Sequence, residues 1–328
     1  MNIVITGATG FIGTRLANRL SAEGHAVTAL VRHESPLLSD AVARCHGALS
    51  DRESLRQAVA GADAVVHVAG RTKAFTARGF LRVNEDLTQA VAEVVDRFAP
   101  PHAALLYVSS QAAVGPCNEP PGLRETDQPA PVSYYGFSKL LGERAVLALA
   151  ARRPVAVARP SMVYGPGDAA FAPLYRCMQK GFLPAAGPAG QRFSIVHVDD
   201  LVEGLMLAVA SLGHGRANAR VLHFAGPQSF VWEDYAEAFG LALERRVRVL
   251  RTRVPALYSV ALGNTLFNAL GLPTLHLTFD KCREALAPGW LLDCARTVDS
   301  IGYVPRRGLV EGAAETLAWC REKGLLRG

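Results

Sequence analysis

The first thirteen residues set three glycines between a short apolar run and a helical pattern, and this arrangement constrains the fold more than any other stretch. The run Ile3 to Ile5 predicts a buried strand, and the glycines follow at Gly7, Gly10 and Gly13. The first glycine permits a tight turn, the second lets the backbone approach a pyrophosphate, and the third lets the helix pack closely on the strand. The helix N-terminus then directs free N–H groups at the phosphates. The opening therefore predicts a dinucleotide-binding unit.

Strand and helix patterns alternate through the first half of the chain. Apolar runs typical of strands lie at residues 26–31, 42–46, 64–68, 104–108, 155–158 and 221–224. Helical patterns lie at residues 11–22, 53–60, 84–98 and 138–151. The alternation predicts an α/β fold, with a doubly wound parallel sheet (Rossmann type) and helices on both faces.

The alternation breaks down after Tyr164, where glycine and proline become frequent. We predict a dinucleotide-binding domain of residues 1–165 and 194–226, and a smaller C-terminal substrate lobe of residues 166–193 and 227–328. Residues 254–272 are apolar and long enough to consider as a membrane span, but Ser259, Asn264 and Asn268 argue against one. We expect an apolar helix of the substrate lobe there and no transmembrane span. A peripheral membrane contact stays open.

Composition excludes several classes of function. The net charge of +6 is spread out, and no run of Lys or Arg alternates with aromatic residues, so we expect no nucleic-acid partner. The six cysteines show no Cys-x-x-Cys pairing, which indicates free thiols in a reducing compartment and no metal site. Because the first residues form a core strand, we expect no signal peptide and a cytoplasmic location.

The second predicted strand ends at Arg32 and His33, about 20 residues after the glycine turn. An acidic residue at this place would accept hydrogen bonds from the ribose hydroxyls of NAD. Arg32 offers instead a cation and a fork of donors, which suit a 2′-phosphate. We therefore expect NADP as the cofactor, with NAD as the alternative.

The fourth predicted strand leads into small residues, Ala69 and Gly70, which let the chain pass close to a cofactor. We expect His67, inside that strand, to pack rather than to catalyse. Arg71 and Lys73 follow at the carboxyl end of the sheet, where ligands bind. They either attract an acidic substrate or are simply solvated.

Tyr135 and Lys139 stand four residues apart, on one face of a predicted helix. They follow Ser110, which comes after a strand that points to the same edge of the sheet. When a hydride moves between a carbon atom and a nicotinamide, a proton must move to or from the oxygen. A nearby ammonium lowers the pKa of a phenol, so Tyr135 would be the acid/base catalyst and Lys139 would lower its pKa and hold the nicotinamide ribose. Ser110 would orient the substrate oxygen.

These segments together resemble the extended short-chain dehydrogenase/reductase family, the NAD(P)-dependent epimerase/dehydratase superfamily. The resemblance rests on the opening Thr-Gly-Ala-Thr-Gly-Phe-Ile-Gly, on Ser110 and on the pair of Tyr135 and Lys139. The matching segments follow in order from residue 2 to about residue 200. The family's catalytic hydroxyl stands five residues before the glycine that matches Gly115, which selects Ser110 over Ser109. The resemblance thus implies a triad of Ser110, Tyr135 and Lys139.

The resemblance also extends the predicted cofactor site. Residues 159–168 look like the family's segment that borders the nicotinamide, and residues 193–200 look like its His-Val-Asp-Asp motif. The family often has an acidic residue against the adenine amino group, but Ala48 stands there, so we expect Leu49 alone to pack on the ring. The predicted cofactor-binding residues are Gly7, Thr9, Gly10, Phe11, Ile12, Gly13, Arg32, Leu49, Val68, Ala69, Gly70, Tyr135, Lys139, Pro160, Met162 and Val163.

For three acidic residues outside that set we predict a structural role. We expect Asp51 to cap the helix that begins near residue 53, and Asp199 and Asp200 to cap the helix that follows them. His197, in the same motif, is expected to be structural rather than catalytic.

Three departures distinguish the chain from sugar-nucleotide enzymes of the family. Val114 stands where those enzymes usually have Tyr, and Phe193 stands where they commonly carry a diphosphate-binding Arg. Gln111 and Ala112 stand where a dehydratase has an acidic pair. The chain looks closer to the dihydroflavonol-reductase and 3β-hydroxysteroid-dehydrogenase-like branch. Its substrate lobe is rich in apolar residues that suit a hydrophobic or aromatic substrate: Phe171, Leu174, Phe182, Leu183, Phe267 and Leu270.

We therefore expect an oxidoreductase that transfers a hydride between NADP(H) and a carbonyl or alcohol of an apolar small molecule. A sugar-nucleotide epimerase or dehydratase is the second hypothesis, and a non-catalytic dinucleotide-binding sensor is the third. Because the triad is intact, the sensor is disfavoured. The helices at residues 84–98 and 138–151 are rich in apolar residues, and members of the resembled family often pair through them, so we also expect a homodimer.

Overall fold

The main sheet has seven strands, all parallel, in the order β10-β6-β5-β4-β1-β2-β3. The computed structural model describes residues 1–274 and 277–326. The chain winds outward from β1 to β3 and then returns to β4 on the other side, which is the doubly wound topology. The predicted fold class is confirmed. The strands are β1 Asn2–Thr6, β2 Ala26–Val31, β3 Ala43–His46, β4 Ala64–His67, β5 Ala104–Val108, β6 Val155–Pro160 and β10 Arg220–Phe224.

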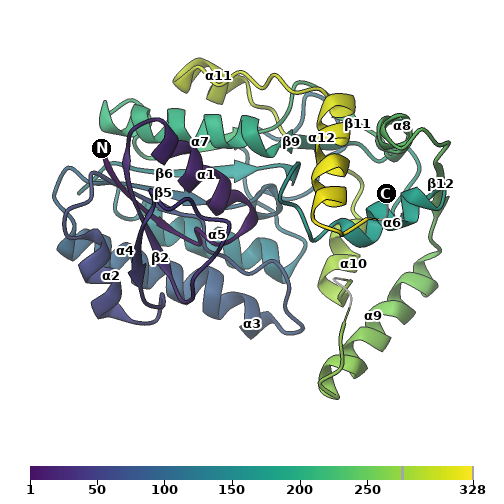
Figure 1. Cartoon of the computed structure of the whole chain (residues 1–328), viewed down its shortest axis with the longest axis horizontal. Helices are drawn as coiled ribbons and strands as arrows, with labels where there is room; N and C mark the ends of the chain where they lie inside the picture. The colour runs from purple at the N-terminus through teal and green to yellow at the C-terminus, as the bar shows by residue number, and fades with distance from the viewer. Residues whose placement is uncertain (275–276, 327–328) are drawn as a thin grey trace.

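Helices cover both faces of this sheet (Figure 1). One face packs against α1 (Phe11–Ala22) and α7 (Val198–Gly213), and the other packs against α2 (Arg52–Val59), α4 (Leu87–Phe98) and α5 (Tyr134–Leu147). Successive residues of a strand point to opposite faces, so Ile3 and Ile5 join the first cluster while Val4 joins the second. Strands buried on both faces explain why the apolar runs are continuous rather than alternating.

The helix expected at residues 84–98 is two elements. A π-helical turn, η1 (Arg82–Asp86), precedes α4. Asn84 of this turn is buried, and its amide donates to the Arg71 carbonyl at 2.9 Å and to the Ser138 hydroxyl at 3.0 Å. The buried amide therefore ties the irregular turn to the chain after β4 and to α5.

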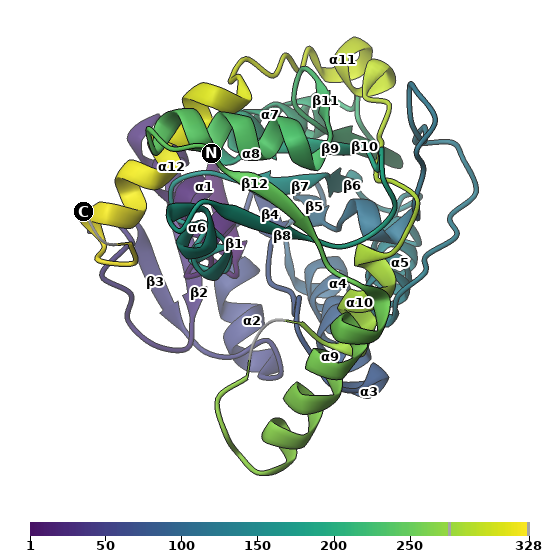
Figure 2. The same cartoon turned by 90° about the vertical axis from the view of Figure 1, so that its right-hand side faces the viewer.

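Outside the main sheet and its covering helices, the chain forms two small sheets and several helices (Figure 2). Its core includes a stack of aromatic rings, in which Tyr175 and Tyr235 both lie on Phe239, at centroid distances of 5.1 and 4.5 Å. The strands are β7 Met162–Tyr164, β8 Phe182–Ala185, β9 Phe193–His197, β11 Ser229–Phe230 and β12 Arg248–Arg251, and the helices are α6 Ala172–Gln179, α8 Trp232–Ala242, α9 Val254–Ala269, α10 Phe279–Ala285 and α12 Leu309–Glu322.

The division of the chain into two domains stays a prediction. Ile301, the last residue of α11 (Ala295–Ile301), and Tyr303 pack in the cluster of β1 and α7, although we assigned residues 227–328 to the substrate lobe. Tyr303 meets Phe224 of β10 edge to face, with ring centroids 5.1 Å apart. By their packing, these residues would belong with the sheet.

The apolar helix expected within residues 254–272 forms as α9, which projects from the rest of the molecule beside α10 (Figures 1 and 2). Among the helices built from the described residues, none is long and apolar enough to cross a membrane. The apolar residues of α4 and α5 that favoured a dimer, such as Val91, Val95 and Val146, are buried within this chain. The homodimer therefore stays a prediction, to be checked by light scattering.

Candidate active site

The glycines of the opening meet the end of β4 in close backbone contact. Gly7 has a φ of +75°, which favours glycine, and a Cβ there would lie 2.5 Å from the Ala69 nitrogen. A Cβ on Gly13 would collide with the Gly7 carbonyl. The third glycine therefore allows the close packing of α1 on the turn that the sequence predicts.

The N-terminus of α1 is suited to an anion. Its N-cap residue is Gly10, which has no capping side chain, and within the described chain no acidic residue stands in the first turn. The N–H groups that open an α-helix lack partners inside it, and the helix dipole adds positive potential there. A phosphate would satisfy these groups, so the cradle of Gly7, Gly10 and Gly13 fits a dinucleotide.

The other predicted cofactor residues lie around the same edge of the sheet. Val68, Ala69 and Gly70 follow β4, and buried Pro160 ends β6. A Cβ on Gly167, in the loop after β7, would lie 2.8 Å from the Phe11 ring, so this loop lies over the start of α1. The residues in partly buried positions are Phe11, Ile12, Leu49, Met162 and Val163, while Thr9 and Arg32 are exposed.

Arg32 follows β2 with its side chain exposed. Glu34, the nearest acid along the chain, pairs with Arg44 at 3.2 Å and with His46 at 3.0 Å. Within residues 1–274 and 277–326, no acidic side chain forms an ion pair with Arg32. Its guanidinium therefore remains available to an anionic group.

Ser110, Tyr135 and Lys139 come together where β5 ends and α5 begins. Tyr135 and Lys139 lie one turn apart on the buried face of α5, and the Ser110 hydroxyl lies near enough to Tyr135 to act to lower the pKa of its phenol. The Lys139 Nζ lies 3.3 Å from the position that a Cβ would take on Gly70. Contacts therefore run without a break from Gly7 through Ala69 and Gly70 to Lys139.

We expected Lys139 to lower the pKa of Tyr135, but other groups have that effect. The Lys139 Nζ donates to the Val108 carbonyl at 2.7 Å and lies 4.4 Å from the centre of the Tyr107 ring. Burial lowers the pKa of Lys139 to about 7, although Glu143 favours its charged form. The pKa of Tyr135 is raised, because its burial outweighs the groups that stabilise the phenolate, Lys281 first among them and then Ser110.

Lys281 of α10 supplies the ammonium that acts on Tyr135, and the sequence analysis missed it. Its Nζ lies 4.5 Å from the centre of the Tyr135 ring and 2.6 Å from a carboxylate oxygen of Glu284. Burial by itself lowers the pKa of Lys281, but Glu284 and Tyr135 raise it above its ordinary value, so the group stays protonated. The only sequence signal is the spacing of Lys281 and Glu284, which is common on any helix and gives no indication of Tyr135.

Two acids of α10 also hold the start of α5. Asp280 accepts hydrogen bonds from the N–H groups of Tyr134 at 2.7 Å and Tyr135 at 3.1 Å, and Glu284 accepts one from the Ser133 hydroxyl at 2.6 Å. Ser133 is itself the N-cap of α5. These partners satisfy the first N–H groups of α5, and they fix Tyr135 against α10.

The two neighbouring serines have different environments. The Ser109 hydroxyl donates to Glu143 at 2.6 Å, and Glu143 in turn holds Arg159 at 2.6 Å in a buried ion pair. Ser109 is thus engaged in the structure beneath the site, whereas Ser110 is half-buried beside Tyr135. This difference favours Ser110 as the serine that meets a substrate.

The histidines have structural environments, as expected. His67 lies between the hydroxyls of Thr6 at 2.6 Å and Thr88 at 3.0 Å and stacks on Tyr107. His197 is buried and is the N-cap of α7, where its Nδ1 accepts from the Asp199 N–H at 3.3 Å.

The predicted helix caps have mixed outcomes. Asp51 caps α2, as predicted. The prediction that Asp199 and Asp200 cap α7 is wrong, because His197 takes that place. Asp199 pairs instead with Arg15 at 2.5 Å, and Asp200 accepts from the backbone N–H groups of Arg306 and Arg307.

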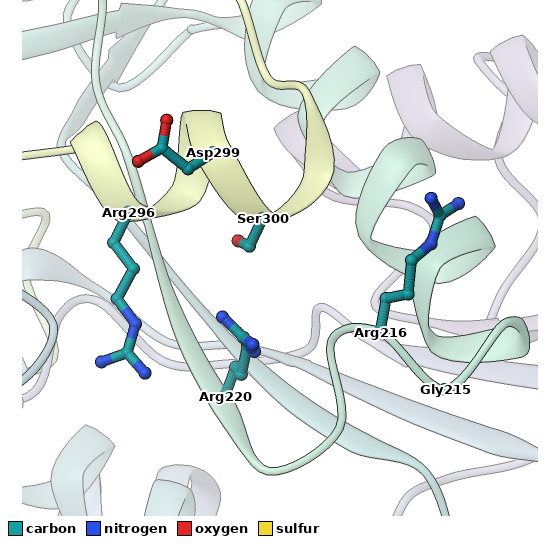
Figure 3. Close-up of a pocket in the computed structure, with 6 residues that line it drawn as sticks. All are labelled: Gly215, Arg216, Arg220, Arg296, Asp299 and Ser300. Carbon is teal, nitrogen blue, oxygen red and sulfur yellow. The ribbon is translucent and has the colours of Figure 1, made fainter.

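The hollow of about 540 Å³ shown in Figure 3 is not part of this site. Arg220, which lines it, is the first residue of β10, so it lies at the amino edge of the parallel sheet, opposite the glycine cradle. Figure 3 also shows the guanidinium groups of Arg216, Arg220 and Arg296 spread around the hollow rather than turned toward one point.

A smaller cavity of about 60 Å³ lies beside the start of α5. Its walls come from the chain after β4, from α3 (Ala77–Leu81) and from α9 and α10. Phe80 of this wall lies 5.9 Å from Tyr135, between ring centroids. The lining is largely apolar and aromatic: Ala74, Phe75, Thr76, Phe80, Tyr134, Thr265, Thr278, Phe279, Asp280 and Arg283.

Comparison with known proteins places this geometry in a family context. The sequence profile described as "NAD dependent epimerase/dehydratase family" matches residues 3–221. The ceramide reductase of Caulobacter vibrioides (strain NA1000 / CB15N) is 28% identical over 327 residues, which cover 99% of this chain and 96% of that protein. The 2-alkyl-3-oxoalkanoate reductase of Stenotrophomonas maltophilia (strain K279a) is 29% identical over 232 residues, which cover 68% and 70% of the two chains.

Solved structures share the fold. The structure of MoeE5 in complex with UDP-glucose and NAD aligns with a TM-score of 0.76 over 98% of this chain and 99% of that chain, at 24% sequence identity. A likeness at this identity concerns the arrangement of strands and helices, and leaves the substrate open.

Proposed function

This chain belongs to the NAD dependent epimerase/dehydratase family and is an enzyme of the extended short-chain dehydrogenase/reductase type, and from that premise we propose that it interconverts a carbonyl and an alcohol of an apolar small molecule with NADP(H). The observation that carries the proposal is the unbroken series of contacts from the glycine cradle through Gly70 and Lys139 to the Ser110–Tyr135 pair. These contacts support a dinucleotide site and a proton donor at one edge of the sheet.

Each residue of the site would have its own role in the reaction. When bound, the nicotinamide supplies a hydride to the carbonyl carbon or takes one from the alcohol carbon. The Tyr135 hydroxyl gives its proton to the carbonyl oxygen in the reduction and receives one in the oxidation. The Ser110 hydroxyl donates a hydrogen bond to the same oxygen and orients it. Lys139, beside Gly70, would hold the nicotinamide ribose.

Lys281 adds a positioning role that was not expected. Once Tyr135 has given up its proton, the Lys281 ammonium at 4.5 Å from the ring stabilises the tyrosinate. Glu284 keeps that ammonium charged and in place. Lys281 would thereby bring the pKa of Tyr135 down from the high value that its burial and the Glu284 carboxylate would give.

An apolar substrate fits the surroundings of Tyr135. The cavity beside it is lined by Phe75, Phe80, Phe279 and Tyr134. Phe193, at the place of the diphosphate-binding arginine of sugar-nucleotide enzymes, is buried and lies 4.5 Å from Trp232 between ring centroids. Two of the similar proteins are named as reductases of a ceramide and of a 2-alkyl-3-oxoalkanoate, which are largely apolar compounds.

NADP is the proposed cofactor. The exposed Arg32, which lacks an acidic partner in the described ranges, would pair with the 2′-phosphate. The cradle itself accepts either dinucleotide, because the pyrophosphate is common to both.

The second candidate is a sugar-nucleotide epimerase, favoured by the fold that the chain shares with a protein solved in complex with UDP-glucose and NAD. An epimerase returns the hydride to the same substrate, so the cofactor shows no net oxidation. The two functions therefore differ in an observable way.

The test is an assay of NADPH oxidation with a panel of a long-chain ketone, a 2-alkyl-3-oxoalkanoate, an oxosteroid and UDP-glucose. The proposal expects net oxidation of NADPH with one or more of the apolar ketones and none with UDP-glucose. Epimerisation of UDP-glucose without net oxidation would support the second candidate. Binding of NADPH without turnover of any member would favour the sensor.

A further inference from the structure

Helix α9 presents an unusually apolar face to solvent. Its buried positions, Leu257, Ala261 and Asn264, recur every three or four residues and face α10. Residues 254–272 carry no charged side chain. Large apolar residues of this stretch are between 43% and 72% exposed: Val254, Val260, Leu262, Leu266, Phe267, Leu270 and Leu272. Soluble proteins seldom leave such a contiguous set uncovered.

A basic segment stands next to this helix. Residues 71–83 contain Arg71, Lys73, Arg78 and Arg82 and no acidic residue. Lys73 fastens the segment to the chain after α9, because its Nζ donates to the Thr274 hydroxyl at 2.8 Å and to the Thr274 carbonyl at 3.2 Å. Figure 2 shows α3, which carries Arg78, at the same end of the molecule as α9.

Two further arginines flank the helix from the other elements. Arg253 immediately precedes α9, and Arg283 lies on α10, where it covers the Tyr134 ring at 5.2 Å. In the described part of the chain, the guanidinium groups of Arg71, Arg78, Arg82, Arg253 and Arg283 have no ion-pair partner, and all five residues are exposed. An apolar helix with an unpaired cationic surround is complementary to an anionic lipid surface.

We propose that the exposed face of α9, with the basic residues around it, docks on an anionic lipid bilayer. At 16 residues α9 is too short to span, since a span takes about 20 residues, so it would lie in the interface with its apolar face toward the acyl chains. A second copy of the chain is a poorer occupant, because a two-fold contact through this face would bring the same unpaired guanidinium groups together.

The docked surface would also face the substrate site, and here the inference rests on the proposed function. Thr265 of α9 and Phe279 of α10 line the small cavity whose opposite wall, Phe80, touches Tyr135. A bilayer on α9 would therefore lie next to the cavity that borders Tyr135. An apolar ketone dissolved in that bilayer would reach the site without crossing water.

Vesicle co-sedimentation of the whole protein tests the docking. We expect binding to mixed phosphatidylcholine–phosphatidylglycerol vesicles that weakens as salt rises, and much less binding to phosphatidylcholine alone. The triple variant V260S/L262S/L266S, which changes only exposed side chains of α9, should bind on the order of 10²-fold more weakly. R78S and R82S should each lower the partition coefficient about fivefold on anionic vesicles. The matched control, L241S/V310S, changes residues that are 60% and 52% exposed elsewhere, and should bind as the wild type does.

The outcomes separate the two proposals. Unchanged vesicle binding by the triple variant, or no binding by the wild type, overturns the docking, and so does self-association that the triple variant abolishes. All substituted residues are exposed, so circular dichroism and melting should show native folding. The variant should still reduce a short, water-soluble ketone at the wild-type rate. Vesicle binding without any NADPH turnover would instead count against the proposed function and leave the docking in place.

Discussion

The sheet and the arm formed by α9 and α10 both reach Tyr135, but they are held in the molecule by different amounts of buried surface. Two large clusters, on either face of the sheet, include Ile5, Leu16, Val66 and Tyr107. Among the residues that the structure describes, the arm's own cluster has Leu257, Ala261 and Cys282 as its buried members. Local opening costs least where few apolar groups are buried, so the arm is the more adjustable half of the site.

This difference assigns two kinds of role. The sheet half carries Ser110, Tyr135 and Lys139 on a backbone whose hydrogen bonds and packing fix their positions. The arm brings Asp280, Lys281 and Glu284, which hold the start of α5 and set how easily Tyr135 loses its proton. The proton affinity of Tyr135 thus depends on whether the arm is in place.

The largest expected effect comes from the sheet half. Tyr135→Phe removes only the phenolic oxygen, so turnover should fall by roughly 10²–10⁴-fold, the usual scale for a general acid/base, while NADPH affinity stays nearly the same. Steady-state kinetics and calorimetric titration measure the two quantities. Near wild-type turnover in the variant would mean that another group moves the proton.

Lys281→Met tests whether the arm changes the pKa of Tyr135 or only holds α5 in place. Without the ammonium, burial and Glu284 leave the pKa of Tyr135 higher, so the rate of alcohol oxidation should fall about tenfold and its pH profile should move to higher pH. The control is Lys281→Arg, which keeps a cation and should restore much of the profile. A profile that does not move in Lys281→Met would reduce Lys281 to a packing role.

Arg32→Asp tests the cofactor edge of the sheet half, away from the arm. Loss of a charge-assisted bond to the 2′-phosphate should weaken NADPH binding about tenfold or more and reverse the preference between NADPH and NADH. The arm should be unaffected, so vesicle binding serves as an internal control. Equal affinity for both cofactors in the wild type, unchanged in the variant, would refute this assignment.

Asp168→Asn has the smallest expected effect and concerns the loop after β7. Burial raises the pKa of Asp168 to about 7, so the folded chain holds a proton that the unfolded chain releases at lower pH. The associated stability is present below the unfolded pKa of 3.8 and is lost as the pH rises through about 7. The variant should therefore melt about 2–4 °C above the wild type at roughly pH 8, with the gap closing at roughly pH 4. A gap that does not depend on pH would contradict the explanation.

Sequence could predict the sheet half because its signals are local. Gly7 and Gly13 are required by close backbone contacts, and for Gly13 the contact is with the turn just before it in the chain. The spacing of Tyr135 and Lys139 places them on one helical face. Strand β5 coincides with its apolar run. The family resemblance then supplied Ser110 as the third member. Fold class and the grouping of these residues follow from such patterns without knowledge of distant contacts.

The arm could not be predicted in the same way, because its contributions are non-local. Lys281 meets Tyr135 only after the chain has completed the sheet and returned, and no spacing in residues 279–285 indicates that meeting. Likewise, no pattern in the sequence indicates that Asp280 accepts the first N–H groups of α5. His197 replaced the predicted acids as the cap of α7 for a related reason, since Arg15 and Arg307 draw Asp199 into ion pairs.

The most direct test of the central claim follows a label from the cofactor. The protein is incubated with the apolar ketones of the panel and NADPH that carries deuterium on the transferring face of the nicotinamide, and the products are examined by mass spectrometry. We expect an alcohol with one deuterium on the former carbonyl carbon, formed in step with NADP⁺, and almost none with Tyr135→Phe. An unlabelled product, or epimerised UDP-glucose with the label still on the cofactor, would contradict it.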